Sequence, residues 1–157
     1  MHHAIYPGSF DPFHNGHLDI VERSSRFCDT LTVAVVNNPY KAAKRFELDE
    51  RLSIIRAATQ HLSNVEVDVF EGLLVAYVKA KGADAIIKGL RTPEDFAFES
   101  QMAHMNRHME PDTETLFLLS EPRWSFLSSS RVRDLDKLEV DLSDLVPAAT
   151  LNALKAH

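Results

Sequence analysis

Residues 6–17 read YPGSFDPFHNGH and lie between a short apolar run, residues 3–6, and a stretch of helical periodicity from about Asn15 to Cys28. The segment holds two prolines, two glycines, two histidines, a serine hydroxyl and a carboxylate. A loop that joins a strand to a helix presents N–H groups and polar side chains at the positive end of the helix, where phosphate binds well. The segment therefore predicts a strand–loop–helix unit that holds a nucleotide.

The rest of the chain alternates strand-like apolar runs with stretches of helical periodicity. Strands are predicted at residues 31–36, 65–70, 85–88 and 115–119, and helices at about 48–62, 73–81, 92–109, from 128 and from 144 onward. This order predicts an α/β fold: a Rossmann-like, doubly wound, five-stranded parallel sheet with helices on both faces, in a single domain over residues 1–157. The helix at 92–109 is apolar on two opposite faces, so we expect one face to cover the sheet and the other to contact another subunit.

Composition excludes several classes of protein. A net charge of −6 argues against a general nucleic-acid binder, which needs a broad basic face. No apolar run approaches the roughly 20 residues of a membrane-spanning helix. Cys28 is the single cysteine, so an internal disulfide is impossible, and no cleavable apolar leader precedes Ala4. We therefore expect a cytoplasmic protein with no nucleic-acid or membrane partner.

The sequence lacks both Gly-x-Gly-x-x-Gly and the P-loop signature, so a nucleotide must be held in another way. The candidate is His14-x-Gly16-His17 at a helix start, where the glycine permits close approach to phosphate and the histidines can donate hydrogen bonds. On spacing alone two alternatives stay open. One is an ordinary tight turn with surface histidines, and the other is a zinc site using Asp11, His14 and His17.

Two further segments offer groups that suit phosphate. Ser128-Ser129-Ser130 with Arg131 and Arg133 combines hydroxyls, helix-start N–H groups and guanidinium charge, while residues 88–91, KGLR, follow the fourth strand. In a doubly wound sheet, ligands bind at the carboxyl ends of the strands. The loops after the first, fourth and fifth strands can therefore face one site.

Taken together, these motifs resemble the His-x-Gly-His nucleotidyltransferase superfamily and, within it, the bacterial phosphopantetheine adenylyltransferases. The resemblance covers nearly the whole chain and is carried by residues 6–12, 15–17, 88–91, 95–96, 101–106 and 124–130. It implies transfer of an adenylyl group from ATP to 4′-phosphopantetheine with Mg²⁺ as cofactor, feedback inhibition by coenzyme A, and a homohexamer. The two-faced helix agrees with an oligomer.

The resemblance also implies site residues by motif position. It assigns ATP contacts to Ser9, Phe10, His17, Gly89, Leu90, Arg91, Glu99, Trp124, Ser125, Phe126, Leu127, Ser128, Ser129 and Ser130. It assigns contacts with the phosphopantetheine acceptor to Ser9, Lys41, Leu74 and Lys88. Three positions depart from patterns in the family: Ser9 replaces threonine, Lys88 replaces arginine and Phe98 replaces tyrosine.

The acceptor is a phosphate monoester and already mostly dianionic at pH 7, so the reaction needs no general base. We predict that His17 contacts the α-phosphate in the transition state, with Ser9 and Lys41 holding the attacking phosphate as the other catalytic residues. Arg91 and residues 128–130, which we call the serine loop, would hold the β- and γ-phosphates. No cage of carboxylates is evident, so no protein metal ligand is predicted and Mg²⁺ would bridge phosphate oxygens mostly through water.

Three rival hypotheses remain at this stage. A nicotinate-mononucleotide adenylyltransferase or a cytidylyltransferase shares the His-x-Gly-His chemistry. A catalytically silent sensor of nucleotides or coenzyme A could use the same fold.

Overall fold

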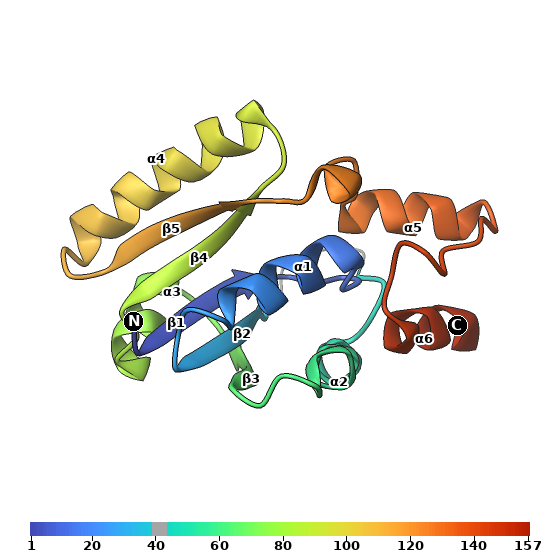
Figure 1. Cartoon of the computed structure of the whole chain (residues 1–157), viewed down its shortest axis with the longest axis horizontal. Coiled ribbons are helices and arrows are strands. Elements are labelled where there is room, and N and C mark those ends of the chain that lie inside the picture. Colours follow the sequence, from blue (N-terminus) through green and yellow to red (C-terminus); the bar gives the residue numbers. More distant parts are fainter. Residues whose placement is uncertain (39–43) are drawn as a thin grey trace.

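The computed structural model describes residues 1–38 and 44–157 and contains a five-stranded parallel sheet (Figure 1). The strands are β1 (His3–Gly8), β2 (Thr30–Val36), β3 (Val65–Phe70), β4 (Ala85–Leu90) and β5 (Glu114–Leu119), in the order β3-β2-β1-β4-β5. Their β-branched and apolar runs suit strands that are covered on both faces. The predicted α/β fold class is confirmed.

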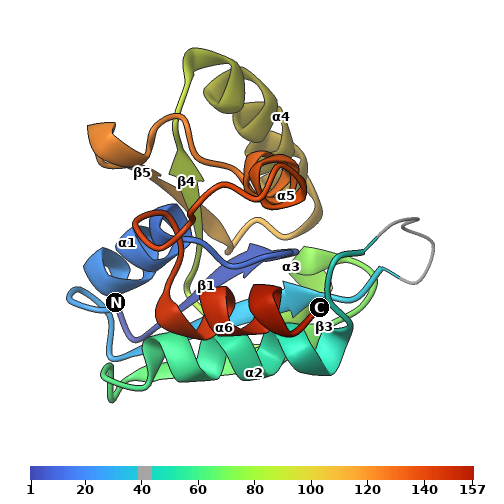
Figure 2. The same cartoon turned by 90° about the vertical axis from the view of Figure 1, so that its right-hand side faces the viewer.

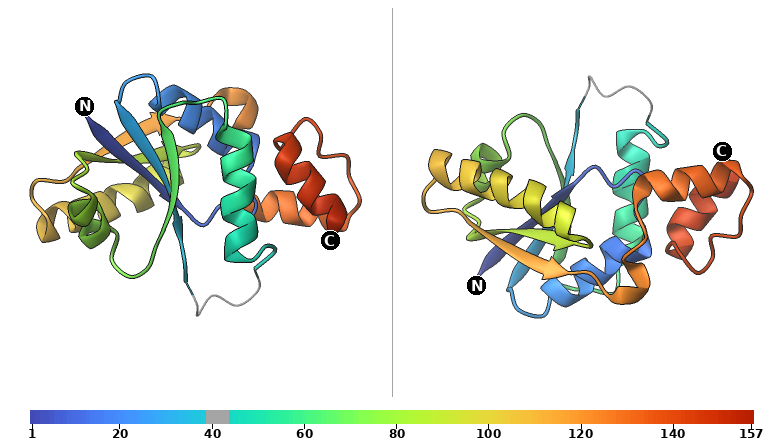
Figure 3. Two further views of the ribbon diagram at one scale, coloured as in Figure 1. Left: turned by 90° about the horizontal axis from the view of Figure 1, so that it is seen from below. Right: turned by 90° about the horizontal axis from the view of Figure 1, so that it is seen from above.

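Helices cover both faces of the sheet (Figures 1 and 2). They are α1 (Asn15–Ser24), α2 (Leu48–Thr59), α3 (Leu74–Lys81), α4 (Pro93–Met109), α5 (Ser129–Lys137) and α6 (Ala148–Ala156), with a short 3₁₀ turn η1 at Pro122–Trp124. The helices α1 and α2 lie on one face, and α3 and α4 on the other. The left view of Figure 3 shows α6 packed beside α2.

Alternation along β1 separates two apolar cores. Tyr6 packs with Val33 and Ile87 in the larger core, beneath α1 and α2. Ile5 packs with Ile86 and Val78 in the smaller core, beneath α3. Each neighbouring residue of β1 therefore faces a different layer of the molecule.

The carboxyl ends of the strands point toward the side on which α5 and α6 lie (Figure 1). Three side chains from this C-terminal region bond to carbonyl oxygens of the loop after β1. They are Ser129 to Pro12 at 2.9 Å, Arg133 to Asp11, and Thr150 to Phe13 at 2.8 Å. The predicted meeting of the first loop and the serine loop at one edge is therefore observed.

Several predicted boundaries differ from the structure. The first helix ends at Ser24, because residues 25–27 turn so that Cys28 packs into the core. The last helix begins after Pro147 rather than near Asp144, because Leu145 and Val146 form turns bonded to the Leu142 carbonyl.

The two apolar faces of α4 both stay largely exposed in the single chain, although α4 lies against β4 and β5. Phe96 contacts Phe117 of β5 edge-on, yet remains 52% exposed. On the other face, Phe98 is 64% and Met105 55% exposed. No described helix is long and apolar enough to span a bilayer.

Candidate active site

A cavity of about 250 Å³ lies at the carboxyl ends of β1 and β4, between the start of α1 and the start of α5. We call it the first cavity. Its lining residues are Tyr6, His14, Gly16, His17, Ile20, Gly89, Arg91, Ser120, Leu127, Ser128 and Ser129. Six of the residues that the resemblance assigned to ATP therefore line one cavity, although the first and last of them are more than 100 positions apart in the sequence. They are His17, Gly89, Arg91, Leu127, Ser128 and Ser129.

The two histidines of the motif form a reciprocal cap at the start of α1. His14 Nδ1 accepts from the backbone N–H of His17 at 3.3 Å, and His17 Nδ1 accepts from the backbone N–H of His14 at 3.2 Å. A neutral imidazole that accepts at Nδ1 carries its proton on Nε2. This arrangement makes each ring an Nε2–H donor.

Both rings remain neutral at physiological pH. Burial lowers the pKa of His14 to about 3, with a further contribution from Arg91. Burial, then His14 and Arg91, hold the pKa of His17 well below its usual 6.5. The rings stack with centroids 3.6 Å apart, so two protonated rings would repel each other strongly.

The free energy of unfolding should fall as the pH drops below 6.5, the ordinary pKa of histidine. The unfolded chain takes up protons that the native pair excludes, so each histidine contributes a slope of up to about 1.4 kcal/mol per pH unit. The stabilisation is complete above pH 6.5 and is lost progressively toward pH 3, the region to which the pKa of His14 is lowered. Urea denaturation between pH 7.5 and 5 measures this slope.

The His14→Gln variant isolates the contribution of the pair. It removes one of the two titrating rings while keeping a side chain able to accept at the cap. We expect a clearly shallower slope between pH 6.5 and 5. Identical slopes in the two proteins would contradict the assignment to these histidines.

Two aromatic side chains pack against the His17 ring and hold it in place. The Phe10 ring meets His17 edge-on at 5.0 Å, and the Phe13 ring stacks on it at 5.5 Å. Phe10 adopts a φ of 48°, a left-handed conformation that is costly for a residue with a side chain. Its ring folds back so closely over Gly8 that a Cβ there would lie 2.8 Å from it. Glycine at position 8 is therefore what lets Phe10 support His17.

Arg91 closes the opposite wall. Its Nε donates to Asp95 Oδ2 at 3.1 Å and its Nη1 donates to the Leu127 carbonyl at 2.8 Å. These bonds join the end of β4, the first turn of α4 and the serine loop. The guanidinium is therefore held in place as a fixed positive charge beside the first cavity.

The serine loop begins α5. Ser128 caps this helix by accepting from the N–H of Arg131 at 3.1 Å, and it also bonds the Ser130 hydroxyl at 3.0 Å. Ser129 lines the first cavity while its hydroxyl donates to the Pro12 carbonyl. The N-terminal end of α5 thus lies at the first cavity, and the N–H groups of a helix start suit an anion.

A second cavity of about 510 Å³ opens on the opposite side of β1, along α3 and α4. Pro7, Gly8, Leu74, Lys88 and Glu99 contribute to its lining, and the Met102 and Met105 side chains make its outer wall apolar. Lys88 Nζ pairs with Glu99 at 3.2 Å. Two predicted acceptor contacts therefore share a cavity with Glu99, which the resemblance assigned to ATP.

Ser9 lies at a third, smaller cavity of about 150 Å³, which Asp11, Lys44 and Arg51 also line. The Arg51 guanidinium is buried and donates to the Ser9 carbonyl at 2.8 Å. Successive residues of the β1 end thus face three neighbouring spaces. Lys41, the predicted partner of Ser9, lies outside the described residues.

The remaining predicted contacts lie around the first cavity rather than in its lining. Phe10 and Leu90 are buried, and Trp124 packs beside Gly16. Ser125 donates to the Pro122 carbonyl, and Phe126 is half exposed. The roles of all these residues remain predictions.

Some residues of the site had no role in the sequence-based prediction. Tyr6, Ile20 and Ser120 line the first cavity, and Arg51 supports the Ser9 backbone. The alternation of side chains along β1 shows that Tyr6 and Ile5 face opposite sides of the sheet. It does not show which of these sides α1 covers, so it could not place Tyr6 at the cavity. His14, one of the two motif histidines, also lies in the cavity wall.

The geometry does not favour the zinc alternative. The Asp11 oxygens accept from the N–H groups of Arg45 and Phe46 at 2.9 Å, and both histidine Nδ1 atoms are engaged in the cap. In the part of the chain that the structure describes, no three histidine, cysteine or acidic side chains are grouped to hold a metal.

Comparison with known proteins gives one consistent result. The cytidylyltransferase-like family model matches residues 5–135. The phosphopantetheine adenylyltransferase of Alkaliphilus metalliredigens (strain QYMF) is 48% identical over 96% of each chain, and that of Clostridium botulinum (strain 657 / Type Ba4) is 45% identical over 99% of this chain and 94% of its own. A crystal structure of a putative nicotinate-nucleotide adenylyltransferase from Vibrio parahaemolyticus superposes with a TM-score of 0.73 over 98% of this chain and 99% of its own, at 17% identity.

Fold and family match define the class of protein as a nucleotidyltransferase. The structural neighbour supports the fold alone, because its identity is low. With relatives 45–48% identical over nearly their full length, the chain belongs to the phosphopantetheine adenylyltransferase family. The resemblance inferred from the motifs is confirmed.

Proposed function

We propose that the chain transfers an adenylyl group from ATP to 4′-phosphopantetheine, yielding dephospho-CoA and pyrophosphate in the penultimate step of coenzyme A synthesis. The observation that carries the proposal is the first cavity, in which a neutral Nε2–H donor, a fixed guanidinium and a serine-rich helix start converge. The membership of the chain in the family supports the choice of substrates.

In this proposal the nucleotide occupies the first cavity. Gly89 lets the nucleoside pass close to the end of β4, where a Cβ would crowd Ile20 at 3.1 Å. Arg91, the Ser128 hydroxyl and the N–H groups at the start of α5 hold the β- and γ-phosphates. His17 faces the α-phosphate.

The reaction is an in-line displacement at the α-phosphorus. An oxygen of the acceptor phosphate forms a new P–O bond as the bond to the β-phosphate bridging oxygen breaks, and pyrophosphate leaves with that electron pair. The acceptor is already dianionic, so no proton has to be removed. The Nε2–H of His17 donates to an α-phosphate oxygen and stabilises the charge that develops there.

The acceptor approaches from the second cavity. Its phosphate would reach the end of β1 beside Ser9 and Lys88, while its uncharged arm lies against Leu74 and the methionine face of α4. Lys41 remains a proposed phosphate contact from the resemblance alone. Because Lys88 carries a point charge rather than the guanidinium fork, it orients the phosphate less rigidly than arginine would.

The residues present fit a magnesium ion carried in with the nucleotide. None of the described residues that line the first cavity carries a carboxylate, so their side-chain oxygens are hydroxyls, among them those of Ser120, Ser128 and Ser129. Hydroxyls can contact the hydration shell that Mg²⁺ retains. The ion would neutralise phosphate charge when bound.

One assay tests the function directly. The purified chain is mixed with ATP, Mg²⁺ and 4′-phosphopantetheine, and dephospho-CoA and pyrophosphate are measured. Parallel reactions substitute CTP for ATP, or nicotinate mononucleotide for the acceptor. Product only from ATP with phosphopantetheine is the expected result. Product from another pair, or binding without turnover, would overturn the proposal in favour of a rival enzyme or a sensor.

We also propose that the chain assembles into a homohexamer through α4. A large exposed apolar face is typical of an interface, and α4 carries Phe98, Met102, Met105 and Met109 on one side. Met105→Lys should lower the sedimentation coefficient by breaking the assembly. Leu138→Lys is the matched control, because Leu138 is 73% exposed but follows α5. An unchanged coefficient in the Met105 variant would contradict this interface.

Coenzyme A carries the same uncharged arm as the acceptor, so we propose that it inhibits by competing for the second cavity. The expected pattern is competitive inhibition against phosphopantetheine. The proposed place of work is the cytoplasm, where ATP is available.

A further inference from the structure

Tyr6 is a buried residue whose hydroxyl has no hydrogen-bond partner among the described residues. It lies in β1 and is 6% exposed. Among residues 1–38 and 44–157, no side chain or backbone group makes a hydrogen bond with its hydroxyl. The residue lines the first cavity, so the hydroxyl has open space rather than packed atoms beside it. The polar group of a buried residue normally has a hydrogen-bond partner, and for a hydroxyl beside a cavity that partner can be a ligand or water.

The position of the hydroxyl is fixed by its neighbours. The Tyr6 ring meets Phe10 edge-on at 5.3 Å, and Phe10 in turn meets His17 at 5.0 Å. A Cβ placed on Gly89 would lie 3.8 Å from the Tyr6 hydroxyl. The phenol therefore extends from the side of His17 toward the end of β4.

The phenol is a neutral donor in this site. Burial, and then Asp19, raise the pKa of Tyr6 above its ordinary value of 10. The hydroxyl keeps its proton at any physiological pH, and it can donate to one oxygen while accepting from another. A neutral group of this kind adds orientation without adding charge next to Arg91.

We propose that the Tyr6 hydroxyl hydrogen-bonds the ribose–α-phosphate part of the bound nucleotide, between the region of His17 and that of Gly89. This inference rests on ATP being the substrate, as proposed above. It makes Tyr6 a nucleotide contact that also orients the α-phosphate toward His17. The chemistry recognised is the set of oxygens that a nucleoside monophosphate shares with the triphosphate and that pyrophosphate lacks.

The Tyr6→Phe variant removes one oxygen and keeps the ring that packs against Phe10. Calorimetry without acceptor measures binding of ATP and of AMP, and inhibition of wild-type and variant turnover measures pyrophosphate affinity. We expect about 3- to 10-fold weaker binding of both ATP and AMP, the range for one hydrogen bond. Pyrophosphate affinity and the KM for phosphopantetheine should not change.

Tyr77→Phe is the matched control. The Tyr77 hydroxyl bonds Asp68 at 2.8 Å, on the other face of the sheet. ATP and AMP affinity should be unchanged in this variant. An equal loss of ATP and AMP affinity in both variants would overturn the inference, because the effect would then not depend on the position of the hydroxyl.

Two other results would overturn the inference. If Tyr6→Phe binds ATP and AMP as tightly as the wild type, the hydroxyl does not contact the nucleotide. If only pyrophosphate affinity falls, the hydroxyl contacts the leaving group instead. Failure of the proposed function looks different, because the wild-type chain would then form no dephospho-CoA. An enzyme that turns over normally yet binds ATP equally with and without the hydroxyl refutes only the role of Tyr6.

Discussion

The His17→Ala enzyme should turn over about 10²- to 10³-fold more slowly than the wild type, the range for loss of one preorganised donor. His17 presents a neutral Nε2–H because its Nδ1 accepts from the His14 backbone. That proton stabilises charge that grows only as the α-phosphorus is attacked, so kcat should fall more than ATP affinity. Steady-state kinetics with ATP binding by calorimetry separates the two.

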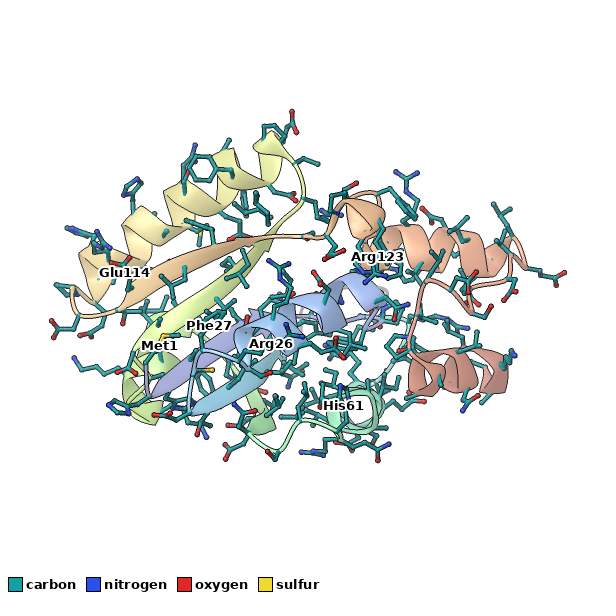
Figure 4. All side chains as sticks on the ribbon, in the orientation of Figure 1. Met1, Arg26, Phe27, His61, Glu114 and Arg123 are labelled. Atoms are coloured by element: carbon teal, nitrogen blue, oxygen red, sulfur yellow. The ribbon has the colours of Figure 1, made fainter. Side chains whose placement is uncertain are left out.

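His61→Ala is the control for this variant. His61 lies at the surface beside the end of α2 and pairs with Glu22 at 2.9 Å (Figure 4). The His61→Ala substitution removes an imidazole that lies outside the cavity, so kcat should stay within twofold of wild type. A folded His17→Ala protein with near-normal turnover would refute the role given to His17.

Asp11→Asn should lower the free energy of unfolding by about 1–3 kcal/mol, the cost of leaving a buried donor without its partner. Asp11 is 4% exposed, and each of its carboxylate oxygens accepts one backbone N–H, from Arg45 and Phe46. An asparagine side chain has one acceptor oxygen, so its NH₂ group must face one of these donors. Urea denaturation at pH 7.5 measures the loss.

Asp134→Asn supplies the comparison for Asp11. Asp134 is exposed on α5 and has no hydrogen bond or ion pair with any described residue, so the free energy of unfolding of this variant should change by less than about 0.5 kcal/mol. Equal stability of the Asp11 variant and wild type would show that the carboxylate does not fasten the two loops. Turnover of the Asp11 variant should also fall, because Ser9 and His17 flank the fastened residue.

The sheet was predictable because its strands carry their own signal. The run at residues 31–36 is apolar at nearly every position, as expected of a strand covered on both faces, and it forms β2. The start of α4, predicted at residue 92, was equally local, because Thr92 caps the helix by accepting from the N–H of Asp95 at 3.2 Å. Such features depend on residues three or four positions apart.

The site was predictable in its residues but not in its supports. The motifs indicated His17, Arg91 and the serine loop, which do meet at one cavity. The sequence could not indicate that Asp11 fastens a segment 34 residues away, or that Arg51 is buried beneath Ser9. Both depend on tertiary contacts, and an arginine in an amphipathic helix is ordinarily a surface residue.

The loop after β1 is bonded to residues that lie more than 100 positions later in the chain, and this affects when the site can form during synthesis. The loop after β1 is made before the segments that it contacts: its carbonyl groups bond to Ser129 and Thr150, and Asn15 bonds to the Asp144 carbonyl. Closure of such distant pairs comes late, because the chain entropy lost grows with their separation. A nascent chain therefore has no complete site until the residues around Thr150 are made. Removal of the C-terminal 20 residues should abolish activity, although none of them lines the first cavity.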